Sequence, residues 1–169
     1  SVNSIKQITK AMKMVATSKM RGDLMRLAAG KDFGVGSIDT VFASDTYMKV
    51  RIPAGKDGSE LLVPITSDKG LCGSINSGVV RGVRDYLSTK DRSKVSIFSI
   101  GDKGTVAFMR PMADILKCGV SEIQTPYNYP TAMALSEILV RESEAANSDK
   151  IVVMYNEFVS AISTNIRHL

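Results

Sequence analysis

The stretch IKQITKAMKMVATSKMR, residues 5–21, has the residue spacing of a helix and contains no acidic residue. Its apolar side chains Ile8, Met12 and Val15 are three or four residues apart, which places them along one face of a helix. No proline interrupts residues 1–30. A helix of that length spans roughly 45 Å. This is long for a small globular domain and is typical of a coiled-coil arm.

The basic charge of the chain is concentrated in this helix. The 169 residues carry a net charge of +5. Asp23 is the one acidic residue before Asp32, and it stands against seven basic residues: Lys6, Lys10, Lys13, Lys19, Arg21, Arg26 and Lys31. The helix therefore carries +6, and the remainder of the chain is close to neutral. An asymmetry of this kind indicates that one segment meets an acidic partner.

The methionines of the helix do not form a single stripe. Met12 and Met14 lie about 200° apart at 100° per residue, and Met20 and Met25 widen the distribution. A helix with apolar and basic groups on all sides is expected to be enclosed by partners. Methionine suits surfaces that repack against more than one neighbour.

Two kinds of partner fit a basic, enclosed helix. A nucleic acid would have its phosphates neutralised by the lysines, and such a surface usually shows one basic stripe with aromatic side chains. An acidic protein socket requires neither. The basic residues here are scattered, and residues 1–30 contain no aromatic residue. The pattern favours the protein socket, and a basic α/β nucleic-acid-binding module remains the alternative.

Composition limits the possible chemistry. With 44% apolar residues the chain can bury a core, and no apolar run approaches the roughly 18–20 residues that cross a bilayer. Cys72 and Cys118 are expected to be reduced thiols, and the single His168 leaves little for histidine-based catalysis. No signal peptide is recognisable, and the absence of an initiator methionine indicates a processed or trimmed start.

Strands and helices are expected to alternate after a loop at 53–60. The predicted strands are 61–67, 94–101, 119–125, 150–158 and 160–169, and the predicted helices are 74–90, 102–110 and 130–147. Pro64 indicates that the neighbouring strand on its N–H side is missing or irregular. The alternation predicts an α/β sheet with helices on both faces, a small Rossmann-like domain. The predicted organisation is a helical arm and its exit at 1–45, a linker at 46–60 and the α/β domain at 61–169.

Two glycine-containing turns follow predicted strands. SDKGLCGSIN (67–76) lies where a nucleotide-binding fold has its phosphate loop, but its spacing matches neither phosphate-binding glycine motif. GDKG (101–104) could hold an anion at a helix N-terminus, although a plain strand-to-helix turn is favoured. We expect no catalytic residue, cofactor or metal site.

The helix and the first turn together resemble a known family. IKQITKAMKMVATSKMR resembles the N-terminal helix of the gamma subunit of F-type ATP synthase, the central rotor stalk. ITSDKGLCGSIN (65–76) is similar to the turn after the first strand of that family's Rossmann-like domain, and IVVMYNEFVSAIS (151–163) follows in the family's order. The resemblance covers nearly the whole chain. Compared with the family pattern, the C-terminal helix is absent.

The resemblance implies a non-catalytic subunit that couples proton-driven rotation to ATP synthesis. Its implied partners are the alpha and beta subunits of the catalytic hexamer, the small central-stalk subunit (delta or epsilon) and the membrane c-ring, with no nucleic acid. The implied location is the matrix side of the mitochondrial inner membrane, as a peripheral subunit. The bacterial cytoplasmic membrane face is the alternative.

The resemblance also implies roles for individual residues. Ile8, Met12 and Val15 match the coiled-coil and bearing side of the family helix, and Met12 falls where the family faces the lever loop of the catalytic subunits. The family's basic positions facing the ring are matched by Lys10, Lys13 and Lys19. The family turn motif is matched by Ser67, Asp68, Lys69, Gly70, Leu71, Cys72 and Gly73.

Overall fold

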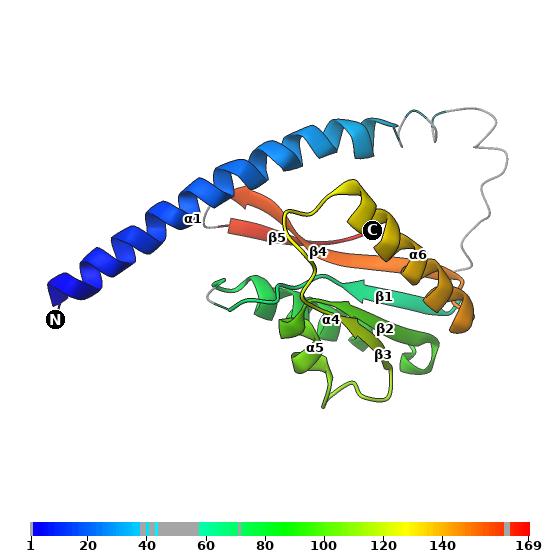
Figure 1. The fold of residues 1–169 in the computed structure, drawn as a ribbon. Helices are drawn as coiled ribbons and strands as arrows, with labels where there is room; N and C mark the ends of the chain where they lie inside the picture. Colours follow the sequence, from blue (N-terminus) through cyan, green and yellow to red (C-terminus); the bar gives the residue numbers. More distant parts are fainter. Residues whose placement is uncertain (1, 38–39, 41–42, 44–57, 71, 161–162) are drawn as a thin grey trace. The chain divides into compact units, whose positions relative to one another are not determined.

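The computed structural model divides the chain into two compact units, Ser1–Pro53 and Ala54–Leu169. The described residues are 2–37, 40, 43, 58–70, 72–160 and 163–169 (Figure 1). Most of the predicted loop and linker lies outside the described residues. The predicted boundaries at residues 45 and 60 therefore stay a prediction.

The first unit contains the long helix predicted for residues 1–30. Helix α1 extends over Val2–Lys31, and none of its residues is buried. A π-helical segment, η1, follows over Asp32–Gly36. It contains Gly34 and Gly36, which are weak helix formers. The sequence left open whether the chain leaves the helix here, and the structure shows helical backbone through this segment with altered hydrogen bonding.

The second unit is built on a five-stranded sheet of order β3-β2-β1-β4-β5. Its strands are β1 (Glu60–Pro64), β2 (Val95–Ile100), β3 (Leu116–Val120), β4 (Lys150–Ser160) and β5 (Ser163–His168). Strands β1 to β4 are parallel, and β5 is antiparallel to β4, as a hairpin. The helical elements between them are α4 (Ile75–Ser88), η2 (Arg92–Lys94), α5 (Asp102–Phe108) and α6 (Tyr129–Ala145). The predicted Rossmann-like α/β fold is confirmed.

Helices cover both faces of this sheet, as predicted. On one face α4 presents Val79, Val83 and Leu87, spaced four residues apart, to a buried cluster that includes Leu62 of β1. On the other face Leu61, Val63 and Phe98 form a second buried cluster, against which Leu139 of α6 packs. Alternate residues of β1 thus serve opposite faces, because successive strand side chains point to opposite sides. Figure 1 shows α4 and α5 lying together, away from α6.

Pro64 lies in the central strand, so its neighbours are both present. Its pairing is irregular on one side, as the sequence indicated. The ladder between β1 and β2 runs from Glu60 to Leu62 and returns only as a bridge between Ile65 and Ile100. The amides of Ile65 and Thr66 donate to β4 and to Ile100 respectively. Strand geometry therefore turns position 64 toward β2, where proline has no N–H to donate.

The strand predicted at 119–125 is wrong in its boundaries. The structure places β3 at Leu116–Val120, where side chains alternate between partly buried and exposed. Beyond it, Glu122 adopts a φ of 56°, a left-handed conformation that does not continue a strand. The alternation of Leu116, Cys118 and Val120 was the signal that the prediction missed.

Candidate functional site

The predicted bearing side of α1 is an exposed apolar row. Ile8, Met12 and Val15 leave 60%, 56% and 59% of their surface accessible. At 100° per residue they fall within about 60° of one another around the helix. Helices of soluble proteins normally bury such a row. The row is therefore available to a partner.

The three predicted basic contact residues do not share one side of α1. Helical geometry places Lys10 and Lys13 opposite the apolar row, whereas Lys19 continues the row one turn beyond Val15. All three are exposed. Positive charge thus surrounds the helix, as the scattered sequence pattern indicated.

Polar groups within α1 are partly engaged by the helix itself. The hydroxyls of Thr9 and Thr17 donate to the carbonyls of Ile5 and Lys13, each at 2.8 Å. Asp23 pairs with Arg26. The lone acidic residue of the helix is therefore already matched, and the remaining cations are left to attract an outside partner.

The turn after β1 is closed by its own hydrogen bonds. Asn76 Oδ1 accepts the backbone N–H of Ser67 at 2.9 Å, and Asn76 Nδ2 donates to Ser67 Oγ at 2.8 Å. The Cys72 thiol donates to the carbonyls of Lys69 and Gly70 at 3.2 and 3.3 Å. The sequence did not predict that Asn76 closes this turn. An asparagine at the start of a helix, where its amide can bond nearby backbone groups, was the signal that could have indicated it.

The same turn is tied to the GDKG segment. Asp68 Oδ1 accepts the backbone N–H of Asp102 at 3.0 Å, and the carbonyl of Ser67 accepts that of Lys103 at 3.1 Å. Gly101 adopts a φ of 98°, and a Cβ there would lie 2.3 Å from the carbonyl oxygen of Thr66. The glycine thus permits a close approach between two loops, which supports a plain turn.

Six of the seven residues of the predicted turn motif lie within the described residues. Ser67, Asp68, Lys69 and Gly70 lie together after β1, and Cys72 and Gly73 lead into α4. Gly73 has a φ of 61°, which favours glycine. Leu71 lies outside the described residues. The turn belongs to the second compact unit, and the predicted contact residues of α1 belong to the first.

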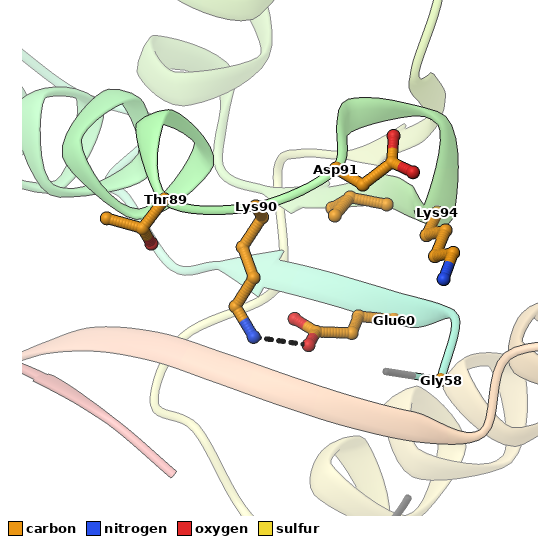
Figure 2. Close-up of a pocket in the computed structure, with 7 residues that line it drawn as sticks. Gly58, Glu60, Thr89, Lys90, Asp91 and Lys94 are labelled. Carbon is orange, nitrogen blue, oxygen red and sulfur yellow. Dashed lines mark hydrogen bonds and ion pairs between the residues drawn. The ribbon is translucent and has the colours of Figure 1, made fainter. Parts of the chain in front are cut away.

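A buried carboxylate that the sequence did not reveal lies where β1 begins. Glu60 is 3% exposed. Lys90 Nζ and Lys150 Nζ lie 2.8 and 2.9 Å from its Oε1, and Tyr86 Oη donates to its Oε2 at 2.6 Å. Figure 2 shows Lys90 reaching Glu60 beside Thr89, Asp91 and Lys94. The negative charge of Glu60 is paired with two lysines inside the cluster. Such pairing is typical of a structural role and not of a catalytic one.

Opposing effects act on the pKa of Glu60. Burial raises it, but hydrogen bonds from Lys90, Tyr86 and Lys150 together outweigh burial and lower the pKa to about 2. The pKa of Tyr86 is raised by burial and by its bond to the carboxylate. The carboxylate thus stays ionised at neutral pH.

The described part of the chain contains no group of three or more histidine, cysteine, aspartate or glutamate side chains arranged to hold a metal ion. Cys72 and Cys118 are free thiols. None of the described helices combines the length and apolarity that crossing a membrane requires.

Comparison with known proteins places this arrangement in a family. The family model described as ATP synthase matches residues 1–169. A chain in the structure of the central stalk and c-ring of the Tetrahymena thermophila mitochondrial ATP synthase is 40% identical, with a TM-score of 0.83, over 96% of this chain and 70% of that one. The chain belongs to the ATP synthase gamma-subunit family.

Gamma subunits from mitochondria and bacteria are among its relatives. The mitochondrial gamma subunit of Saccharomyces cerevisiae is 30% identical, covering 96% of this chain and 52% of the relative. The gamma chain of Methylorubrum populi is 31% identical, covering 96% of this chain and 59% of the relative. The chain therefore spans between half and two thirds of the length of the curated relatives it matches.

Proposed function

We propose that this chain is a non-catalytic segment of the central rotor stalk of an F-type ATP synthase, and that it couples proton-driven rotation to ATP synthesis in surrounding subunits. The observation that carries the proposal is α1, whose apolar row is more than half exposed within a strongly basic helix. The likeness to a central stalk over nearly the whole chain supports it. These relatives give no support to the nucleic-acid alternative.

The surface of α1 suits a shaft that turns inside a ring. Ile8, Met12 and Val15 form the bearing and coiled-coil side, and the flexible thioether of Met12 packs against neighbours of differing shape. Lys10, Lys13 and Lys19 attract acidic groups of the ring from several directions. Because exposed charge pairs are individually weak, such contacts can be exchanged as the shaft turns.

The proposed partners follow from the family. They are the alpha and beta subunits of the catalytic hexamer, the small delta or epsilon subunit of the central stalk, and the c-ring. The mitochondrial relatives and the Tetrahymena stalk support a mitochondrial location. We place the chain on the matrix side of the inner membrane, as a peripheral subunit.

Reconstitution tests this function. The 169-residue chain is mixed with the hexamer of alpha and beta subunits prepared from Tetrahymena mitochondria, and co-elution is measured by size-exclusion chromatography. We expect a complex with one chain per hexamer. A triple variant with Lys10, Lys13 and Lys19 changed to glutamate should bind at least about tenfold more weakly, since attraction becomes repulsion.

The matched control changes three basic residues of the α/β unit to which the sequence resemblance assigns no contact with the ring: Lys69→Glu, Lys117→Glu and Arg110→Glu. All three are exposed, and the variant has the same net charge as the α1 variant. It should retain the affinity of the unchanged chain. Equal loss in both variants, or no complex with the unchanged chain, would count against the rotor-stalk proposal.

A further inference from the structure

A groove between α4 and α5 gathers basic side chains around an apolar floor. It has a volume of about 330 Å³ and is lined by Val80 and Ala107, with Arg81, Arg84 and Lys103 at its rim. The rim residues are exposed, whereas Val80 and Ala107 are half-buried. Both helices belong to the second compact unit, as do all the residues that line the groove.

Two of the three rim cations, Arg81 and Arg84, carry charge that no ion pair neutralises within the described part of the chain. The third, Lys103, is 3.2 Å from its neighbour Asp102. Elsewhere in this unit several basic residues are matched, as in the ion pairs Lys90–Glu60 and Arg92–Asp114. The α4–α5 groove is thus a site of local positive charge on a body whose remaining charges are largely balanced.

We propose that the α4–α5 groove binds an acidic, extended segment of a partner protein. One apolar side chain of that segment packs on Val80 and Ala107, and flanking carboxylates pair with Arg81, Arg84 and Lys103. A guanidinium presents a planar fork of donors that matches a carboxylate in two parallel hydrogen bonds. The two arginines, three residues apart on α4, meet carboxylates that follow one another along the segment.

Charge complementarity favours such a segment over other anions. A phosphate carries no apolar group, so it would leave the floor of Val80 and Ala107 uncovered. A membrane surface is flat and cannot reach the apolar floor of a concave site. An extended peptide supplies carboxylates and an apolar side chain at once. The inference does not depend on the proposed rotor function, because it concerns a separate unit.

Binding of a defined probe tests this inference. The full 169-residue chain is titrated into a fluorescein-labelled decapeptide of glutamates with two central leucines, and fluorescence anisotropy is recorded at low salt. We expect saturable binding. Changing Arg81, Arg84 and Lys103 together to glutamine should weaken it by about tenfold or more. These side chains are exposed, so the variant should keep the circular dichroism spectrum of the unchanged chain.

A matched variant separates the groove from the basic helix. Changing Lys10, Lys13 and Lys19 to glutamine removes the same charge from α1, whose cations also attract acidic groups, and should weaken peptide binding several-fold less than the groove variant does. A second groove variant, Ala107→Glu, should abolish binding by placing a carboxylate on the floor. The inference is overturned if the groove variants bind normally, or if the α1 variant accounts for the loss. It is also overturned if the binding of inorganic phosphate or of phosphatidylserine vesicles requires the three rim cations and the binding of the peptide does not.

Discussion

Lys90 Nζ lies 2.8 Å from Glu60 Oε1, so that the second residue after α4 is bonded to the first residue of the central strand. Lys150, the first residue of β4, reaches the same oxygen, and Tyr86 of α4 donates to the other. One carboxylate therefore connects α4, β1 and β4. Because Glu60 is buried, its carboxylate depends on these partners in place of water.

Replacing this carboxylate should destabilise the α/β unit. We expect Glu60→Gln to lower the free energy of unfolding by about 2 to 4 kcal/mol, because two partly exposed lysines lose the buried charge that opposes them. Urea unfolding of both proteins measures the difference. Asp114→Asn is the control, since Asp114 pairs with Arg92 on the surface and its loss should change stability by less than about 1 kcal/mol. Equal effects would contradict a special role for the buried cluster.

The same carboxylate should make stability depend on pH. The folded pKa of Glu60 is about 2, below the ordinary value of 4.5. Its stabilising contribution is therefore complete above pH 4.5 and is lost as the pH falls toward 2. The contribution is on the order of 3 kcal/mol. Urea unfolding at intervals from pH 6 to pH 2.5 should show the Glu60→Gln variant losing less stability than the unchanged chain, and parallel curves would refute this assignment.

Gly101 should tolerate no side chain. Its φ of 98° is unfavourable for other residues, and a Cβ would lie 2.3 Å from the carbonyl oxygen of Thr66. We expect Gly101→Ala to destabilise the unit by about 3 kcal/mol or more. Gly70→Ala is the matched control in the neighbouring turn, where nothing lies within 4 Å of the added carbon, and it should unfold at nearly the same urea concentration as the unchanged chain. A mild effect at Gly101 would mean that the two loops can separate.

Asn76 should hold the turn after β1 in place. Its amide both accepts from the Ser67 backbone and donates to the Ser67 hydroxyl. Asn76→Ala should lower stability by about 1 to 2 kcal/mol, because a partly buried N–H loses its acceptor. The control is Ser77→Ala, in which the lost hydroxyl donates to the carbonyl of Ser74 just before the same helix, and little change is expected because the hydroxyl is exposed. Thermal melts of the two variants compare them directly, and similar melting temperatures would show that water replaces the amide.

The sequence predicts those parts of the fold that rest on local periodicity. Val79, Val83 and Leu87 recur at helical spacing, and the helix they predict buries all three. The shifted boundaries of β3 show the limit, because GVSEIQT offers β-forming residues on both sides of the point where the backbone of Glu122 turns. A left-handed residue of this kind leaves no periodic signal.

Side-chain clusters are harder to predict than elements. Glu60 meets Tyr86 and Lys90 only after the chain has crossed from β1 through α4, and Lys150 arrives with β4. No spacing in the sequence links these positions, since the parallel register brings Lys150 beside Glu60 and the packing of α4 brings Tyr86 and Lys90. The basic charge of α1 is visible in the sequence because all of its members are local. Their roles against a ring stay a prediction.

Met12 and Lys13 should affect binding to the catalytic hexamer in different ways. Packing at a contact governs mainly how fast a complex separates, whereas exposed charge governs mainly how fast it forms and how it responds to salt. Met12→Ala should therefore raise the dissociation rate several-fold and leave the salt dependence unchanged, because it removes only part of the apolar row. Lys13→Gln should lower the association rate at low salt, by about twofold, and lose this effect as salt screens the charge. Stopped-flow measurements with the labelled chain at two salt concentrations distinguish the two, and a shared kinetic effect would contradict the assignment of Met12 to packing and Lys13 to attraction.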